Sequence, residues 1–161
     1  MYFHMCVCAQ MNKDNMVQDE VFQQQLQLKG NKMAYNCQAR VLYVDDDEDS
    51  REMLCLLLRS SRIEVKAVAT AAHALSSIQI DPFDLYLLDS WLPDLDGFEL
   101  CRRIRRLLPH APILFFSGAA YETDKQRAIE VGANAYVIKP DVGGLLESIT
   151  QFIPRSKSAV A

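Results

Sequence analysis

The chain has 161 residues, of which 50% are hydrophobic and 24% charged, and these values are typical of one soluble globular domain with a single core. Its formal net charge of −4 gives no whole-molecule attraction to nucleic acid or to an anionic membrane, so we expect neither as a direct partner. No apolar run approaches the roughly 20 residues that span a bilayer, and residues 1–10 lack the features of a secretion signal. We therefore expect a cytoplasmic protein with reduced cysteine thiols.

The first part of the chain differs from the rest in composition and in hydrophobic periodicity. Residues 1–39 are rich in Gln, Asn and Met and show only a faint helical period, so we interpret them as a mobile N-terminal extension. We place the folded domain at residues 40–153 and interpret residues 154–161 as a C-terminal tail. Met11, Met16 and Met33 are alternative translation starts, so it stays open whether the extension belongs to the native protein.

From Val41 onward, short apolar runs alternate with stretches in which apolar residues recur every three or four positions. The runs that we interpret as strands are residues 41–44, 63–68, 85–88, 113–116 and 135–138. The stretches that we interpret as helices are residues 50–58, 71–78, 98–108, 124–131 and 145–153. This alternation predicts about five βα units, with a parallel sheet covered by helices on both faces.

Ligands of such sheets bind beyond the carboxyl ends of the strands, so the residues that follow each strand carry the most information. These are Asp45 and Asp46 after the first strand, Asp89 after the third, Ser117 after the fourth and Lys139 after the fifth. Three carboxylates at one edge repel one another unless a divalent cation neutralises them, and oxygen ligands favour Mg²⁺, or Mn²⁺. A cation, an ammonium and a hydroxyl together can hold a phosphoryl group, so the pattern predicts phosphoryl transfer.

Four segments of the chain resemble response-regulator receiver domains, in the order and at the spacing of that family. They are YVDD at residues 43–46, LLDSWLPDLDGF at 87–98, ILFFSG at 113–118 and GANAYVIKP at 132–140. The resemblance implies a single domain with a flavodoxin-like, doubly wound (βα)5 fold, in which a parallel five-stranded sheet has the strand order 2-1-3-4-5.

By the same resemblance, Asp89 is the phosphoacceptor that takes a phosphoryl group from a phosphohistidine. Asp46, Asp89 and the backbone carbonyl of Trp91 would bind Mg²⁺, and Asp45 would act through a water. We also expect the indole of Trp91 to border the site; the alternative is that its ring points into solvent or lies against a helix.

Three further roles follow from the resemblance. Lys139 would pair with Asp89 and then with the phosphoryl group, whereas Ser117 would turn to bond a phosphoryl oxygen. Tyr136 would then turn inward as the second switch residue. The peptide bond between Lys139 and Pro140 is expected to be cis.

Two other functions are weighed against this one. The Asp94 to Gly97 segment superficially resembles the nucleophile motif of haloacid-dehalogenase-like phosphatases, but that motif must follow an apolar strand directly, so we prefer Asp94 or Asp96 as a helix cap. The basic stretch in the third predicted helix, which suggests nucleic acid, is interpreted as a solvated outer face; it consists of Arg102, Arg103, Arg105 and Arg106.

Beyond Lys139 and Pro140 there is room for one helix and a short tail, so we expect a stand-alone receiver with no attached output domain. It would catalyse its own phosphorylation and dephosphorylation without being a multiple-turnover enzyme. Its partners would be a histidine kinase or a histidine phosphotransfer protein, and a downstream protein target. The alternative is a pseudo-receiver that binds a partner constitutively, although a purely structural domain need not keep mutually repelling carboxylates.

The first predicted helix supplies candidate docking residues for the phosphodonor. Asp49, Met53 and Leu56 share one face beside the site, and Pro140 is a further candidate. The opposite face is expected to enter the core, and it consists of Leu54, Leu57 and Leu58.

Overall fold

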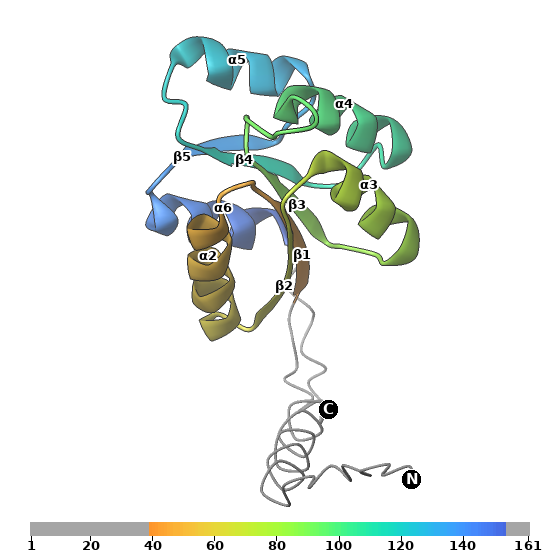
Figure 1. Ribbon diagram of the computed structural model, residues 1–161. Coiled ribbons are helices and arrows are strands. Elements are labelled where there is room, and N and C mark those ends of the chain that lie inside the picture. The colour runs from red at the N-terminus through yellow and green to blue at the C-terminus, as the bar shows by residue number, and fades with distance from the viewer. Residues whose placement is uncertain (1–38, 154–161) are drawn as a thin grey trace, which may run out of the picture. The chain divides into compact units, whose positions relative to one another are not determined.

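The computed structural model describes residues 39–153, so the expected N-terminal extension and C-terminal tail lie outside the described residues, except that Ala39 already belongs to the first strand. Five parallel strands form one sheet in the order β2-β1-β3-β4-β5 (Figure 1). They are β1 (Ala39–Val44), β2 (Ile63–Val68), β3 (Leu85–Leu88), β4 (Ile113–Ser117) and β5 (Ala135–Ile138). The predicted fold class and strand order are confirmed.

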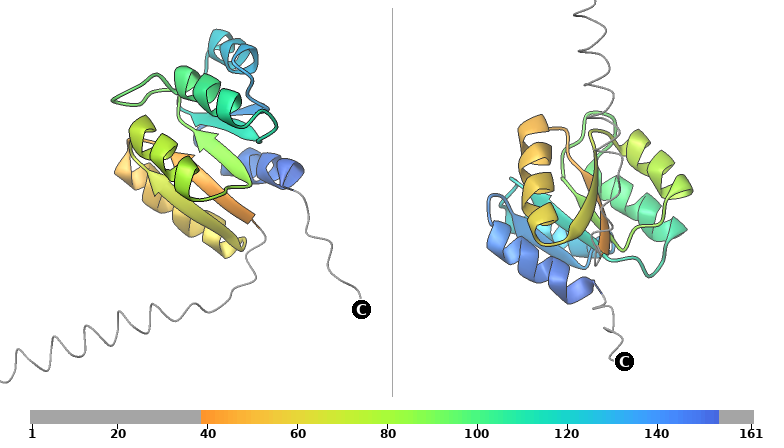
Figure 2. Two further views of the ribbon diagram at one scale, coloured as in Figure 1. Left: turned by 90° about the vertical axis from the view of Figure 1, so that its right-hand side faces the viewer. Right: turned by 90° about the horizontal axis from the view of Figure 1, so that it is seen from below.

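Five helices connect the strands and cover the sheet. They are α2 (Glu48–Ser60), α3 (Ala71–Ile80), α4 (Gly97–Leu107), α5 (Glu122–Glu130) and α6 (Val142–Phe152). Helices α2 and α6 lie on one face, and α3, α4 and α5 lie on the other (Figures 1 and 2). Within residues 39–153, no helix has the length and apolar character needed to cross a bilayer.

Each face of the sheet has its own core, because successive strand residues point to opposite faces. In β1, Leu42 and Val44 pack with the layer of α3, α4 and α5, whereas Val41 and Tyr43 pack with α2 and α6. The central strand β3 is buried along its whole length, since both of its faces are covered.

The burial of α2 corrects one expectation. Leu54 and Leu58 are fully buried as predicted, but Leu57, which we expected in the core, is 36% exposed. Residues four apart lie above one another on a helix, so Leu54 and Leu58 share the buried stripe, whereas Leu57 is rotated by about 100° from Leu58. Leu57 therefore lies at the margin of the core.

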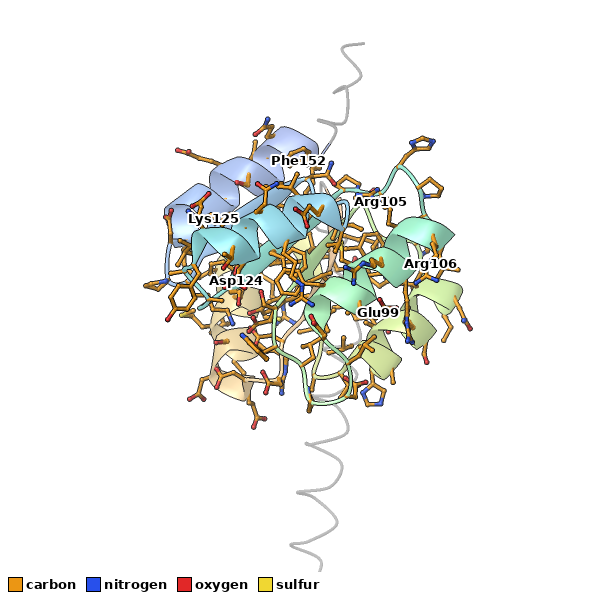
Figure 3. The ribbon with its side chains drawn as sticks, turned by 90° about the horizontal axis from the view of Figure 1, so that it is seen from above. Glu99, Arg105, Arg106, Asp124, Lys125 and Phe152 are labelled. Atoms are coloured by element: carbon orange, nitrogen blue, oxygen red, sulfur yellow. The ribbon has the colours of Figure 1, made fainter. Side chains whose placement is uncertain are left out.

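We expected all four arginines of α4 to be solvated, but one of them is not. Arg102, Arg103 and Arg106 do lie at the surface, where they pair with Glu99. Figure 3 labels Arg106 and Glu99 on α4. Arg105 is partly buried, and its guanidinium donates to the carbonyl oxygens of Pro109, Ala111 and Gly132. This side chain ties α4 to the start of β4 and to the loop before β5, so it is part of the fold.

Candidate functional site

The site lies where the strand order reverses, between β1 and β3, at the carboxyl ends of the strands. Val44 is paired with Leu88 in the parallel register, so the residues that follow them, Asp45 and Asp89, emerge side by side. Both carboxylates are buried: Asp45 is 0% exposed and Asp89 is 8% exposed. The amide of Asp89 donates to the Val44 carbonyl at 2.9 Å, which extends the ladder to the site itself.

A third carboxylate completes an acidic cluster. One carboxylate oxygen from each of Asp45, Asp46 and Asp89 lies within 4.8 Å of the others, and Asp46 is the exposed member. Asp45 already accepts hydrogen bonds on both oxygens, from the Asp47 amide on Oδ1 and from Lys139 on Oδ2. Hard oxygen donors with an open side are the set that Mg²⁺ prefers, so these residues fit the ion that the sequence predicts. Asp45 and Asp89 both accept hydrogen bonds on each of their carboxylate oxygens, whereas the exposed Asp46 carboxylate accepts none from the described residues, so Asp46 has the freest oxygens to hold the ion.

Lys139 lies between the two buried carboxylates. Its Nζ is 2.6 Å from Asp45 Oδ2 and 2.9 Å from Asp89 Oδ2. Burial works to lower the pKa of Lys139, but hydrogen bonds and charges from Asp45 and Asp89 outweigh it, so the pKa is raised above its ordinary value. The Lys139 amide donates to the Ser117 carbonyl, and the following bond to Pro140 is cis, as expected.

Two donors converge on the other oxygen of the phosphoacceptor candidate. Ser117 Oγ and the Ser90 amide each lie 2.5 Å from Asp89 Oδ1.

Gly97, the first residue of α4, lies against the backbone of Asp89, and a Cβ there would lie 2.0 Å from the backbone oxygen of Asp89. The close approach of α4 to the end of β3 is therefore possible only with glycine at this position.

Tyr136, the predicted second switch residue, has its ring against the core. It stacks on Phe115 with 5.8 Å between ring centroids, and Phe115 in turn stacks on Phe98 of α4. The Tyr136 hydroxyl donates to the Ala119 carbonyl at 2.7 Å, in the loop that follows Ser117. A change in the position of Ser117 can therefore reach Tyr136 through this loop.

Tyr43 is a site residue that our reasoning from the sequence missed. Its side chain is fully buried, and its hydroxyl donates to Oδ2 of Asp45, the same oxygen that Lys139 contacts. Burial, followed by the hydrogen bond and charge of Asp45, raises the pKa of Tyr43 well above its ordinary value, so the phenol stays protonated. The signal was available, because residues two apart on a strand point to the same face.

The two aspartates that we expected as helix caps act on different helices. Asp96 precedes α4, and its carboxylate accepts from the Phe98 amide at 2.8 Å. Asp94 accepts instead from the amides of Ala71 and Ala72, at 2.9 Å each, in the first turn of α3. The loop after Asp89 is therefore anchored to a second helix, and both carboxylates accept from helix amides, as we expected of helix caps.

The remaining predicted residues lie outside the hydrogen-bonded site. Asp49, Met53 and Leu56 are on the exposed face of α2, with Met53 44% and Leu56 68% exposed, and Pro140 is exposed as well. The indole of Trp91 is 75% exposed, so its ring lies largely in solvent, in agreement with the alternative to a ring that borders the site.

Comparison with known sequences identifies the family. The family model for the response regulator receiver domain matches residues 41–150. The chain belongs to this family. The chain is 39% identical over 109 residues to the transcriptional regulatory protein CseB of Streptomyces coelicolor, covering 68% of this chain and 46% of CseB. It is 33% identical over 100 residues to the transcriptional regulatory protein CreB of Escherichia coli, covering 62% of this chain and 44% of CreB. The chain thus spans less than half the length of these regulators.

Solved structures of receiver domains agree with this assignment. A putative response regulator from Chloroflexus aurantiacus superposes with a TM-score of 0.69 at 34% identity, over 73% of this chain and 98% of that one. The response regulator TrrA of Thermotoga maritima, solved in complex with Mg²⁺ and beryllium fluoride, superposes with a TM-score of 0.66 at 25% identity, over 71% of this chain and 98% of that one.

Proposed function

We propose that this receiver domain is a phosphoacceptor switch, in which Asp89 takes a phosphoryl group from a phosphohistidine in a Mg²⁺-dependent reaction and the modified domain changes its binding to a protein target. The observation that supports the proposal most is the convergence on Asp89. Lys139 contacts one of its oxygens, Ser117 contacts the other, and two further carboxylates lie beside it. These side chains come from the ends of β1, β3, β4 and β5.

The transfer is a substitution at phosphorus. A carboxylate oxygen of Asp89 forms the new P–O bond while the P–N bond to the donor imidazole breaks, and the bonding electron pair leaves with the imidazole nitrogen, which takes up a proton. Lys139 and Ser117 each hold one oxygen of Asp89 and can pass their hydrogen bonds to phosphoryl oxygens as the new bond forms. The domain thus catalyses its own modification and is not a multiple-turnover enzyme.

Mg²⁺, when held by Asp46 and Asp89 and by the Trp91 carbonyl, would supply positive charge to the phosphoryl oxygens. Asp45 would support that site through its hydrogen bonds. Its Oδ1 accepts from the Asp47 amide at 3.0 Å and its Oδ2 accepts from Lys139, so its carboxylate is held in one orientation. Removing Asp45 would therefore disturb Lys139 as well as the ion.

The phosphodonor is proposed to be a histidine kinase or a histidine phosphotransfer protein, since the family acts in two-component signalling. Relatives such as CseB and CreB are transcriptional regulators, which supports a regulatory downstream target.

We propose that the donor docks on the exposed face of α2, where Met53 and Leu56 present apolar surface next to the acidic loop. Leu56→Asp should slow transfer from a phosphohistidine protein and leave the reaction with acetyl phosphate unchanged. Leu107→Asp, at an exposed position near the end of α4, is the matched control, and an equal loss with both donors would contradict docking on α2.

The central experiment is incubation with acetyl phosphate and Mg²⁺, followed by intact mass measurement. The wild-type chain should gain the mass of one phosphoryl group, and Asp89→Asn should gain none while it keeps its fold, because the amide preserves shape and removes the nucleophile. A wild-type protein that folds and binds Mg²⁺ but never takes up a phosphoryl group would be a pseudo-receiver, and undiminished labelling of Asp89→Asn would refute the choice of Asp89.

A further inference from the structure

A closed ring of hydrogen bonds joins the phosphoacceptor to the switch tyrosine and returns to it. On one side, Ser90 Oγ lies 3.3 Å from Tyr136 Oη, which donates to the Ala119 carbonyl at 2.7 Å. On the other side, the Ala119 amide donates to Ser117 Oγ at 3.4 Å, and Ser117 Oγ donates to Asp89 Oδ1 at 2.5 Å. The Ser90 amide also donates to Asp89 Oδ1 at 2.5 Å and closes the ring.

The donors in this ring can be assigned. A tyrosine hydroxyl has one proton, and that of Tyr136 is directed at the Ala119 carbonyl, which cannot donate. The contact between Ser90 and Tyr136 must therefore have the Ser90 hydroxyl as the donor and Tyr136 Oη as the acceptor. Aligned donors in a chain polarise one another, so each bond supports the next.

Ser90 depends on this contact because it is buried. It is only 2% exposed, and every buried polar side-chain atom within residues 39–153 has a hydrogen-bond partner. Among those residues, Tyr136 is the partner of the Ser90 hydroxyl. Movement of Tyr136 away from Phe115 would leave the Ser90 hydroxyl without that partner in a buried position, which is unfavourable.

We propose that Ser90 is a positioning residue of the switch: its hydroxyl holds Tyr136 in the inward position and links that position to the phosphoacceptor through the adjacent peptide unit. This inference rests on the proposed phosphoacceptor function and adds a second connection to the one that runs through Ser117 and Ala119. Loss of the Ser90 hydroxyl removes one typical hydrogen bond from the inward position, so the ratio of inward to outward Tyr136 should fall about fivefold.

The test measures the position of Tyr136 directly. The full chain is labelled with 3-fluorotyrosine, the Tyr136 signal is assigned from its loss in Tyr136→Phe, and its fluorine NMR shift is recorded with and without Mg²⁺ and beryllium fluoride. The ligand-saturated shift defines the inward position. We expect Ser90→Ala to move the ligand-free signal away from that reference and saturating ligand to bring it back. Ser76→Ala is the matched control, because the Ser76 hydroxyl bonds the Ala72 carbonyl on the exposed side of α3, and it should leave the signal unchanged.

The results separate this inference from the proposed function. A ligand-free Tyr136 signal that is the same in wild type and Ser90→Ala overturns the role of Ser90. Should Ser90→Ala fail to fold, Ser90→Cys keeps the shape with a much weaker donor, and it should shift the signal in the same direction; an unmoved signal overturns the inference equally. Phosphoryl uptake by the wild-type chain, measured by mass, tests the proposed function and does not depend on Ser90.

Discussion

Replacing Lys139 with Ala should destabilise the metal-free domain by about 3 kcal/mol. Removal of one partner from a buried ion pair costs about 3–5 kcal/mol, because the other charge is left buried without compensation. Lys139 contacts two such charges, Asp45 at 2.6 Å and Asp89 at 2.9 Å, and Asp45 is 0% exposed. We expect the lower end of the range, because Tyr43 still donates to Asp45 and Ser117 still donates to Asp89 in the variant.

The destabilisation should depend on Mg²⁺. With one positive charge fewer beside the acidic cluster, the Lys139→Ala variant should bind the ion more tightly than the wild type. An ion present at about 100 times its Kd stabilises the folded state by about 2.7 kcal/mol, so saturating Mg²⁺ should restore most of the loss. Stability would then be recovered although the phosphorylation chemistry is impaired, because the ammonium and the ion contact different phosphoryl oxygens.

Urea unfolding at pH 7, with either a chelator or Mg²⁺, measures both effects. The folded pKa of Lys139 is raised above the ordinary 10.5, so the stabilisation is fully present below that pH and is lost only as the pH rises through the folded value. Lys125→Ala is the matched control, because Lys125 of α5 pairs with Glu122 at the surface (Figure 3) and its loss should cost less than about 1 kcal/mol. If the two variants unfold at the same urea concentration without Mg²⁺, the reasoning about buried charge is wrong.

Two further predictions concern other charged and titratable groups. Asp46→Ala should weaken Mg²⁺ binding, and by relieving carboxylate repulsion it should stabilise the metal-free fold; a Mg²⁺ titration by isothermal calorimetry would exclude Asp46 as a ligand if the affinity were unchanged. Burial raises the pKa of the Cys101 thiol from 9.0 to about 11, so its contribution to stability should be present below pH 9 and lost as the pH rises towards 11. Chemical unfolding across this interval should show a smaller pH slope for Cys101→Ala, and an equal slope would rule out the thiol as its source.

Local pattern was sufficient to predict the sheet, as β2, β3 and β5 show. Each coincides with its predicted run: the central strand β3 is a continuous apolar run buried on both faces, whereas β2 and β5 are partly buried edge strands that β-branched residues and flanking turns still mark. The helix starts were less accurate, since α2 begins at Glu48 and α6 at Val142, ahead of the first apolar periodic residue. The capping carboxylates of Asp47 and Asp141 decide these starts. The first turn of α2 is polar and that of α6 contains Gly143 and Gly144, so neither turn carries a hydrophobic period.

Side chains at the margins of the core were placed wrongly for a related reason. Leu57 is apolar yet partly exposed, and Arg105 is charged yet partly buried. Residue type predicts average burial, whereas the carbonyl groups that receive Arg105 come from the loop after α4 and from Gly132, before β5. The spacing of residues within α4 does not predict those partners.

The sequence by itself determined the fold class, the family and the side chains at the strand ends, because alternating βα units bring the carboxyl ends of parallel strands to one edge. Only the tertiary structure decided which atoms meet there: that Tyr43 donates to Asp45, that Asp94 caps α3, and that the hydroxyls of Ser90 and Tyr136, 46 positions apart in the chain, meet. Such contacts depend on the packing of elements that are distant in the chain and on hydroxyl and carboxylate directions, which a one-dimensional pattern does not specify.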